Sequence, residues 1–515
     1  MISTALTGRG RGDFRVHHHG QSIDDLIISY MEHHQIPGMS LAIVQAPYIT
    51  RVVGYGIANT ESRQLVSMNS AFNIGQLTNA FTAVALMQLK EAKQLTLQDK
   101  ISQYLPDIPS NWQSITIHDL LTHSSGIPSY AAEAGFDYSK HYSSKELIAL
   151  VSEKPLLFAP GTQMNNSATD YYLLGLVIEK VSGMSYEAFV TINQIERIGL
   201  KNTFFISTKD KDQNEVANAS STFKHSKFLQ ESSYINPTEQ AQGYTEVDGQ
   251  LKPSVSLDWS TTFADSGIVS SAGDISFWDI ALAGNILVSD PANRQFLYNP
   301  VLLGNKTTPG NANWFFPGHP GLMEIKGQLP GYSAFLSRFT APTELLCVTL
   351  LANKDNLSDL DILARKIAAA FDGKLGVPYG SSWSETMESP YSVETTLDRI
   401  SKLVSHQGGT IFGRVDHSEA AEKVGLALNP TQVLIIGNPA KGTALMQANP
   451  AFALDLPLRI MATKGAAGEV WLSYTDPLKL SKEYNLDKEQ ASLVKQMSNG
   501  LSRLCHKAIS PDDIG

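Results

Sequence analysis

One ten-residue segment restricts the fold more than any other: residues 80–89 (AFTAVALMQL) are apolar on almost every side of a helix. A helix of that kind is stable only when other elements cover it all round. The chain has 515 residues, 42% of them hydrophobic, which is enough to build such a core. Residues 170–181 (DYYLLGLVIEKV) predict a second buried helix, with Asp170 as its N-cap and Gly183 as its C-terminal cap.

Short apolar segments rich in β-branched residues indicate strands in both halves of the chain. Residues 40–44 (SLAIV) and 345–351 (LLCVTLL) predict two buried strands, one near the start of the chain and one about two thirds of the way along it. A further set of segments predicts a second sheet, of which the last two form a hairpin: residues 433–436, 456–462 and 469–474. Asp487 with Gln490 predicts a capping box at the start of the final helix.

These elements divide the chain into two blocks. Residues 1–22 predict a loose terminus, and residues 23–373 a first domain with a polar surface insertion at about 202–256. Pro, Gly, Ser and Glu cluster between the blocks, so residues 374–390 are expected to be a linker. Residues 391–515 then form a second, smaller α/β domain.

Charge and cysteine content exclude several classes of function. The net charge is −10, which argues against a nucleic-acid partner. No apolar run approaches the ~18 residues that cross a bilayer, and the first twenty residues lack the apolar region of a secretory signal. This leaves the compartment undecided. The two cysteines form neither a disulfide framework nor a metal-binding pair, and we expect no metal and no cofactor.

A series of short motifs in the first block indicates a family more specifically than the composition does. In order along the chain these are residues 72–75 (FNIG), 120–128 (LLTHSSGIP), 160–162 (PGT), 267–274 (GIVSSAGD) and 329–333 (LPGYS). In this order and spacing they resemble the superfamily of class C β-lactamases, D-Ala-D-Ala carboxypeptidases and esterases. The resemblance implies an α/β sandwich with an antiparallel sheet and a helical lobe, like that of the penicillin-binding proteins.

The resemblance also implies three catalytic clusters for acyl transfer: Ser-x-x-Lys, Tyr-x-Asn and Lys/His-x-Gly, with an oxyanion hole of backbone N–H groups. The matching positions in this chain are Gln76 and Asn79, Met164 and Asn166, and Ile325 and Gly327. A carboxamide is not an acyl-accepting nucleophile, and neither asparagine nor methionine carries a proton to relay. We therefore expect the first domain to be a catalytically inactive relative of these serine hydrolases.

The polar replacements indicate a different use of the same pocket. Gln76, Asn79 and Asn166 place three amides around the expected catalytic centre, where they could hold a small polar or peptide-like ligand or a partner. The alternative is that these amides only bond one another and fill space. Lys326 is a fourth candidate ligand-binding residue, although alternation along a strand turns it to the opposite face from Ile325.

A relocated nucleophile would make the chain an active serine hydrolase or esterase, which is the main alternative. Thr78 lies inside the first cluster but points elsewhere on a helix. Ser167 is better explained as the start of a helix than as a nucleophile. His123 lies in the Thr-His-Ser-Ser-Gly turn, where a structural hydrogen-bonding role is favoured over that of a base.

The second block carries its own specific runs: residues 436–439 (IGNP), 446–450 (MQANP), 453–458 (ALDLPL) and 471–477 (WLSYTDP). Together they resemble the Domain of Unknown Function 302 family, which implies a small α/β domain and no particular activity. Asp416-His417 is a candidate acid/base or metal pair, but an N-cap followed by a surface histidine is favoured. A further alternative is that this domain carries the function, with the first as its scaffold. We expect any self-association to occur through it.

Overall fold

The computed structural model describes residues 16–18, 20–45, 48–206, 240–303, 306–307, 310–319, 321–340, 345–376, 384–465, 468–480, 484 and 486–511. The chain divides into two compact units. The first comprises Met1–Pro317 with Gly321–Ala364, and the second comprises Gly318–Pro320 with Arg365–Gly515.

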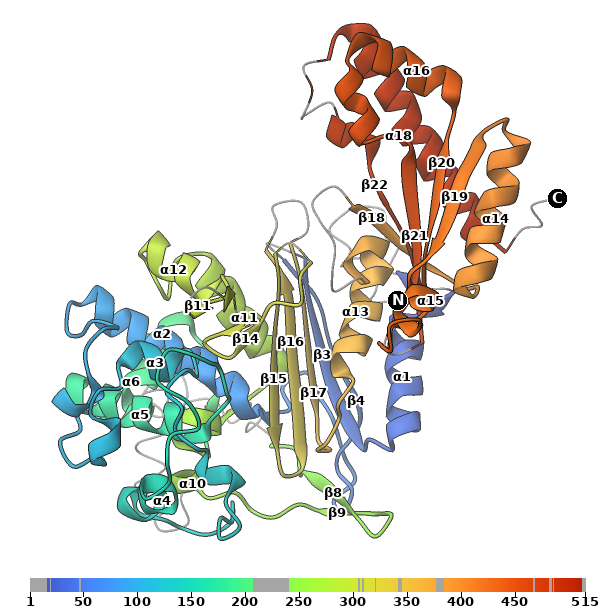
Figure 1. Cartoon of the computed structure of the whole chain (residues 1–515). Coiled ribbons are helices and arrows are strands. Elements are labelled where there is room, and N and C mark those ends of the chain that lie inside the picture. The colour runs from blue at the N-terminus through green and yellow to red at the C-terminus, as the bar shows by residue number, and fades with distance from the viewer. Residues whose placement is uncertain are drawn as a thin grey trace. The chain divides into compact units, whose positions relative to one another are not determined.

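An antiparallel sheet forms the framework of the first unit (Figure 1). Its strands, in spatial order, are β13 (Gly310–Asn311), β14 (Trp314–Phe315), β15 (Leu322–Leu329), β16 (Tyr332–Phe339), β17 (Leu346–Ala352), β3 (Gly38–Gln45), β4 (Tyr48–Asn59) and β5 (Gln64–Leu65). The two strands predicted from residues 40–44 and 345–351 are β3 and β17, which pair with each other near the middle of the sheet. Both are buried along their length except for Gln45, as their continuous apolar sequences predict.

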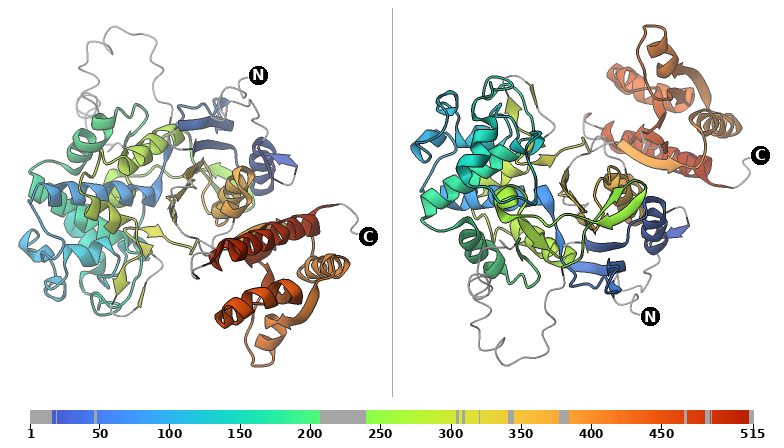
Figure 2. Two further views of the ribbon diagram at one scale, coloured as in Figure 1. Left: turned by 90° about the horizontal axis from the view of Figure 1, so that it is seen from above. Right: turned by 90° about the horizontal axis from the view of Figure 1, so that it is seen from below.

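Helices cover both faces of this sheet. α11 (Ala272–Ala283) packs against β3 and β17 on the side of the helical lobe, and α1 (Ile23–His34) lies on the other side (Figures 1 and 2). The other helices of the lobe are α2 (Thr78–Glu91), α3 (Ile117–Leu121), α4 (Ser144–Ser152), α5 (Ala168–Ser182), α6 (Tyr186–Val190), α7 (Glu196–Ile198), α10 (Trp259–Ser266) and α12 (Pro291–Leu297). α13 (Leu360–Phe371) follows β17 and contains the boundary between the units. The expected sandwich with an antiparallel sheet and a helical lobe is confirmed.

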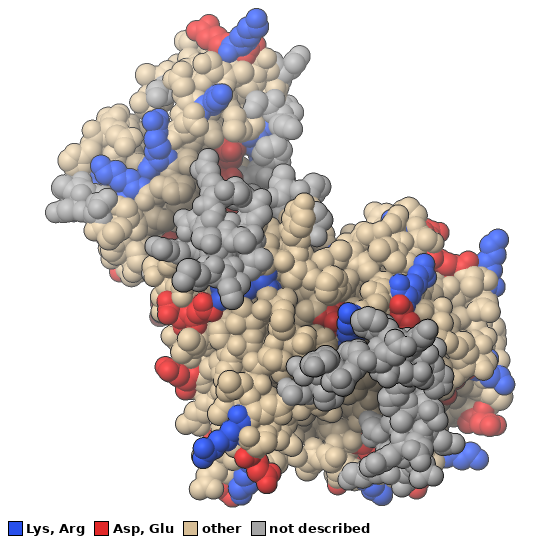
Figure 3. Space-filling view, turned by 180° about the vertical axis from the view of Figure 1, so that it is seen from behind, with Lys and Arg blue, Asp and Glu red and all other residues tan. Residues whose placement is uncertain are grey.

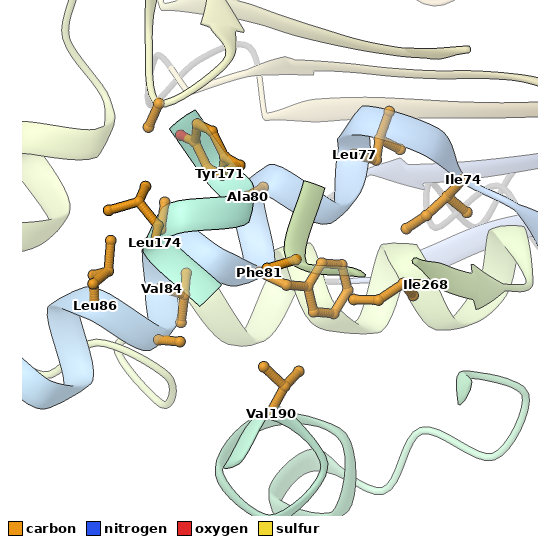
Figure 4. Close-up of a cluster of buried hydrophobic side chains, with 14 of the residues drawn as sticks. Ile74, Leu77, Ala80, Phe81, Val84, Leu86, Tyr171, Leu174, Val190 and Ile268 are labelled. Carbon is orange, nitrogen blue, oxygen red and sulfur yellow. The ribbon is translucent and has the colours of Figure 1, made fainter. Parts of the chain in front are cut away.

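The apolar segment 80–89 forms the centre of the lobe. It lies in α2, where residues 78–87 and Leu89 are all buried. Figure 4 shows Phe81 and Val84 of this helix among side chains from α5, α6 and β10 (Ile268–Ser270). The ring of Phe81 stacks on Trp278 of α11, with 4.3 Å between ring centroids. The prediction that this helix is buried on every side is therefore confirmed.

A small three-stranded sheet connects the lobe to the start of α2. β10 pairs with β6 (Phe72–Asn73) on one side and with β7 (Phe204–Phe205) on the other. Directly after β6, the backbone N–H of Ile74 donates to the carbonyl oxygen of Ile268 at 3.1 Å. The chain then forms a 3₁₀ turn, η2 (Gly75–Leu77), that leads into α2.

A second antiparallel sheet organises the second unit. Its order is β18 (Ser384–Ser389), β22 (Val470–Thr475), β21 (Leu458–Lys464), β20 (Thr431–Gly437) and β19 (Thr410–Asp416). α14 (Val393–His406) and α18 (Lys488–Ile509) pack on this sheet and share one apolar cluster with it (Figure 1). The unit also contains η8 (Gly373–Gly376), α15 (His417–Glu422), α16 (Pro439–Ala448), η9 (Pro450–Leu454) and η10 (Pro477–Lys479).

Local sequence signals in this unit match the structure closely. The predicted hairpin is β21–β22, paired from Ile460↔Tyr474 to Lys464↔Val470. The predicted capping box is present, because Asp487 accepts from the N–H of Gln490 and the Gln490 side chain accepts from the N–H of Asp487. Ser392 is the N-cap of α14.

Three segments differ from the expectation. Residues 384–389 fall within the expected linker, but they form the edge strand β18, because Met387 packs on the core and the strand pairs with all of β22. Residues 377–383 lie outside the described residues. Within the expected insertion, β7 and the hairpin of β8 (Tyr244–Val247) and β9 (Gln250–Pro253) are regular structure, and residues 207–239 lie outside the described residues. Of the expected loose terminus, residues 1–15 also lie outside, whereas β1 (His17–His18) pairs with β2 (Gln21–Ser22).

Candidate functional site

Two glycines allow η2 to pack directly onto strand β15. Gly75 has a left-handed backbone (φ 54°), and a Cβ there would lie 2.6 Å from the backbone nitrogen of Gln328. A Cβ on Gly327 would lie only 1.9 Å from the carbonyl oxygen of Ile74. Gly327 of the expected strand motif therefore has a structural role. It allows the backbone of β15 to pack against the turn before α2.

The side chain of Gln76 spans the gap that this close packing leaves. Its Oε1 accepts a hydrogen bond from the backbone N–H of Gln328 at 2.9 Å, and its Nε2 donates to Oδ2 of Asp265 at 3.4 Å. The backbone carbonyl of Gln76 accepts from Nδ2 of Asn313 at 3.1 Å. The carboxamide of Gln76 is therefore held at both of its polar ends.

Asp265 is the central residue of the site, and no sequence motif indicated it. It lies in the last turn of α10 and is 3% exposed. Burial is the largest influence on its carboxyl group and raises its pKa, while hydrogen bonds with Ser266, Gln76 and Asn79 act in the opposite direction. The available signal was an aspartate that follows Phe263 and Ala264 and comes shortly before a buried strand.

A break in α10 sets the position of Asp265. Phe263 has backbone angles of φ 32° and ψ −129° inside the helix, a conformation that a phenylalanine rarely adopts. The next residue is fixed to α2, because Oγ1 of Thr82 donates to the carbonyl oxygen of Ala264 at 2.7 Å. Asp265 then faces the first turn of α2, where Asn79 lies.

Asn79 occupies the interior of the site. It is 1% exposed, and its side-chain amide lies beside the carboxyl group of Asp265 and lowers the pKa of that group. Its Oδ1 is buried and has no hydrogen-bond partner among the described residues. A buried amide oxygen without a partner is costly, so this atom is an unsatisfied acceptor in the interior beside Asp265.

The second expected cluster lies at the more exposed side of the site. Asn166 is exposed, and its Nδ2 donates to Oδ1 of Asn313 at 3.4 Å. Asn313 thus connects Asn166 to the backbone of Gln76, although it belongs to none of the sequence motifs. Met164 is half-buried and packs its methyl end against Gly310. It presents a thioether at the position of the family's tyrosine.

The third cluster contributes only its glycine. Ile325 is 1% exposed and packs in the apolar core of the unit. Lys326 was a candidate ligand-binding residue, but the structure places it on the opposite face of β15, where its Nζ donates to the carbonyl oxygen of Ser358 at 2.9 Å. Strand alternation explains this position, and Lys326 is not part of the Gln76 site.

The turn at residues 122–126 forms a separate buried network. His123 has a left-handed backbone (φ 54°), and its Nδ1 lies 3.0 Å from Oδ2 of Asp170. Oγ of Ser125 donates to Oδ1 of Asp170 at 2.5 Å. The prediction that Asp170 caps α5 is wrong, because Ser167 holds the N-cap position and Asp170 is drawn into the core by this turn. Burial raises the pKa of Asp170 to about 6, against hydrogen bonds from His123 and Ser125.

Ser167 and two other serines of the family motifs, Ser125 and Ser333, are enclosed and poorly placed to act as replacement nucleophiles. Ser125 is 1% exposed, Ser167 is 2% exposed and Ser333 is 1% exposed. Oγ of Ser167 has no partner among the described residues, and the backbone N–H of Ser167 lies 3.3 Å from Nδ1 of His123. Thr78 points away from the site as expected, and its Oγ1 accepts from the N–H of Ile268 at 3.2 Å.

The second unit contains an apolar cavity of about 350 Å³. It lies between the two apolar clusters of the unit and is bordered by side chains of α14, β19, β20, β21, α16 and α18, including Val404, Phe412, Ile436, Met446, Met497 and Leu501. Gln407, Asn438 and Gln496 add polar groups. In the Asp416-His417 pair, Asp416 is the N-cap of α15 and His417 is exposed, which is the arrangement favoured from the sequence.

The charged side chains, helix lengths and possible metal ligands indicate no further site among the described residues. On the face drawn in Figure 3, Lys and Arg side chains lie singly or in small groups among uncharged surface. In the part of the chain that the structure describes, no helix combines the length and the apolar character that a membrane span requires. The described side chains also contain no group of three or more His, Cys, Asp or Glu arranged to hold a metal ion.

Comparisons with known proteins agree with the two-unit division. The family model described as Beta-lactamase matches residues 23–371, and the one described as Domain of unknown function DUF302 matches residues 385–504. The penicillin binding protein from Bacillus halodurans is similar in structure, with a TM-score of 0.53 and 24% identity over 67% of this chain and 98% of that protein. At that identity the likeness concerns the fold alone.

Two curated relatives share part of the sequence. The chain is 39% identical over 115 residues to fluoride-specific ion channel FluC 1 of Brucella suis biovar 1 (strain 1330), which is 22% of this chain and 45% of that protein. It is 26% identical over 344 residues to protein flp of Staphylococcus aureus (strain MW2), which is 65% of this chain and 63% of that protein. The chain thus spans less than two thirds of either relative.

Proposed function

The chain belongs to the beta-lactamase family over residues 23–371, and we propose that this domain is a non-catalytic member that binds a small polar or peptide-like ligand without forming a covalent bond. The observation that carries the proposal is the hydrogen bond from the N–H of Gln328 to Oε1 of Gln76. That N–H lies on the strand that supplies an oxyanion-hole donor in active relatives.

An acyl-transfer site needs this donor to be free for the substrate's carbonyl oxygen. The chain keeps Gly327 of the strand motif, so the backbone that carries this donor is still present. In the folded chain a side chain at the nucleophile's own position already takes the hydrogen bond. The replacement of serine by glutamine thus removes the nucleophile and blocks a donor at the same time.

The family's two proton carriers, its lysine and its tyrosine, are also replaced in this chain. Asn79 stands where the family has lysine, and its neighbour is the buried Asp265 rather than a hydroxyl group. Met164 stands where the family has tyrosine and packs against Gly310. A relocated serine is disfavoured because the three serines considered above are at most 2% exposed. An acyl group cannot reach them without local opening of the fold.

Intact-mass spectrometry tests the proposal directly. The full chain is incubated with benzylpenicillin and, separately, with a fluorophosphonate, and we expect its mass to remain unchanged. Slow background ester hydrolysis would be compatible with the proposal, since residual donors can accelerate hydrolysis without a nucleophile. A stoichiometric adduct on Ser125, Ser167, Ser333 or another residue would instead establish the alternative, an active hydrolase with a relocated nucleophile.

The cavity of the second unit favours a second candidate function, in which the C-terminal domain carries the binding activity. Its volume of about 350 Å³ lies within the range of ligand pockets, and most of its border is apolar with a few polar groups. The two methionines on its border are flexible side chains that adapt to varied shapes. We propose a compact, mostly apolar molecule as its occupant.

A further inference from the structure

The pairing of the Gln76 side chain defines what its site can bind. One carboxamide uses its carbonyl oxygen to accept from the N–H of Gln328 and its NH₂ group to donate to Asp265. The site therefore offers a fixed donor on one side and a carboxylate acceptor on the other. A ligand that replaces the carboxamide must carry a carbonyl oxygen and a donating nitrogen at a similar separation.

The carboxylate of Asp265 has no cationic partner in the site. Nε2 of Gln76 donates to it at 3.4 Å, the nearby side chains of Ser266 and Asn79 are uncharged, and no ion pair joins it to a lysine or arginine among the described residues. His123 acts on it electrostatically, but the imidazole is bonded to Asp170. A buried carboxylate is costly to ionise without a partner, and burial raises the pKa of Asp265 accordingly.

Asn79 adds a second unsatisfied acceptor at the same place. Its side-chain amide lies beside the carboxyl group of Asp265, and its Oδ1 is buried and has no hydrogen-bond partner among the described residues. Two acceptors side by side match a nitrogen that has several protons to donate. An ammonium group has three donors and a positive charge.

The charge of the pocket is consequently the reverse of the family pattern. Asn79 replaces the family's lysine, Ile325 replaces its strand cation, and Lys326 lies on the opposite face of β15. A ligand with a carboxylate would be repelled by the carboxylate of Asp265 and would have no cation to pair with among these residues. A cationic ligand would meet a carboxylate that lacks a counter-ion.

We propose that the Gln76 site takes a small ligand that presents an ammonium group beside a carbonyl oxygen, as an amino-acid amide does. This inference rests on the proposed non-covalent pocket and specifies its ligand. The half-buried side chain of Gln76 swings out, the ligand's carbonyl oxygen accepts from the N–H of Gln328, and its ammonium group donates to Asp265 and to Oδ1 of Asn79.

Isothermal titration calorimetry on the full chain at pH 7 compares three matched probes. Alaninamide carries a carbonyl and an α-amino group that is mostly protonated, because such groups have a pKa of about 8. N-acetylalaninamide keeps the carbonyl without the charge, and N-acetylalanine replaces the charge with a carboxylate. We expect alaninamide to bind at least about tenfold more tightly than N-acetylalaninamide, a difference of about 1.4 kcal/mol, and N-acetylalanine to bind most weakly.

Three variants separate the contributions. Asp265→Asn should abolish the preference for alaninamide. Gln76→Ala should tighten binding of both amides, because the ligand no longer competes with a built-in carboxamide. Asp258→Asn makes the same change of charge at the start of α10, away from Gln76, and should leave all affinities unchanged.

The outcomes distinguish this inference from the proposed function. Equal binding of all three probes, or tighter binding of N-acetylalanine, would overturn the charge preference and leave the pocket in place. If no probe binds to the wild type or to Gln76→Ala at about 10 mM, the ligand-holding function itself is overturned. A preference for alaninamide that survives in Asp265→Asn would place the cation elsewhere and also overturn the inference.

Discussion

The side-chain oxygen of Gln76 lies 2.9 Å from the backbone nitrogen of Gln328, so a residue at the position of a nucleophile accepts the hydrogen bond that a substrate would otherwise accept. The two residues are 252 positions apart in the chain, and the close approach of Gly75 and Gly327 brings them together. The backbone N–H of Gln328 is thus already paired with the side chain of Gln76, which is the observation on which the proposed non-catalytic function rests.

Replacing Gln76 by glutamate should make stability depend on pH. Nε2 of Gln76 lies 3.4 Å from Asp265, so Gln76→Glu sets two carboxyl groups side by side, and the pKa of one of them rises strongly. A carboxyl group whose pKa is raised in the folded state stabilises the fold at low pH, and that stability is lost as pH rises through the raised pKa. We expect Gln76→Glu to be close to wild type at about pH 5 and destabilised by about 1–3 kcal/mol at about pH 8.

Urea unfolding at the two pH values measures this difference. Gln76→Ala is the matched control, because it loses the same hydrogen bonds without adding a charge and should show one small deficit at both pH values. An equal deficit for Gln76→Glu at both pH values would mean that position 76 does not face Asp265.

Gly327→Ala tests the close packing that positions Gln76. A Cβ at this position would lie 1.9 Å from the carbonyl oxygen of Ile74. This oxygen belongs to the backbone, so it cannot move aside as a flexible side chain can. We expect a loss of about 1–3 kcal/mol, as for other overpacked sites, measured as a lowered midpoint of thermal unfolding. Gly135→Ala is the control, since nothing lies within 4 Å of its added Cβ, and it should stay within about 0.5 kcal/mol of wild type. Similar midpoints for the two variants would contradict the described packing.

The buried Asp170 should add its own pH dependence. Burial raises its pKa to about 6 from an ordinary value of 3.8, so between these values the folded state holds a proton that the unfolded state has released. Stability contributed by this group therefore falls as pH rises from about 4 to about 6 and changes little above that range. The stability of wild type minus that of Asp170→Asn, measured by urea unfolding across this range, should decline with the same profile. A flat difference would contradict the raised pKa.

Filling the cavity of the second unit tests the second candidate function. An added Cβ at Gly500 in α18 meets nothing within 4 Å, and this residue borders the cavity. Gly500→Leu should therefore occupy the space and raise stability by about 1 kcal/mol through helix propensity alone. It should also reduce the fluorescence of bound 1-anilinonaphthalene-8-sulfonate, an apolar probe.

Asn499→Ala provides the control for that experiment, because Asn499 is an exposed residue of the same helix and does not border the cavity. It should raise stability by a smaller amount and leave probe fluorescence unchanged. Undiminished fluorescence with Gly500→Leu would mean that the cavity does not take an apolar ligand.

The helices, strands and caps that depend on residues close together in the sequence could be predicted from it. The buried helix around residues 80–89, the central strands β3 and β17, the β21–β22 hairpin and the capping box at Asp487 follow from apolar periodicity and from side-chain to backbone bonds a few residues apart. The family motifs also placed Gln76, Asn79 and Asn166 near one another, because that arrangement is a property of the fold.

Features that depend on distant partners were not predictable. Asp170 has the residue type and position of an N-cap, but the turn around His123, 47 residues earlier, offers it buried partners that outweigh a cap. The local signal at Asp265, an aspartate shortly before a buried strand, does not indicate its role, since that role comes from a break in α10 and from the neighbouring α2. The edge strand β18 carries polar sequence typical of a linker and is ordered by pairing with β22, which lies far later in the chain.

Returning the family's catalytic residues to positions 76, 79 and 164 tests whether Gln76 and its neighbours are what prevents acylation. Gln76→Ser, Asn79→Lys and Met164→Tyr return the family residues, but a lysine at position 79 would pair with Asp265 and remain protonated. We therefore expect the triple variant to be acylated poorly and the additional substitution Asp265→Ala to increase its acylation. Intact-mass spectrometry after incubation with a fluorophosphonate should show one adduct, at position 76, on the quadruple variant and none on the wild type or on Gln76→Ser alone. An adduct on the wild type, or a folded quadruple variant that never labels, would contradict the account.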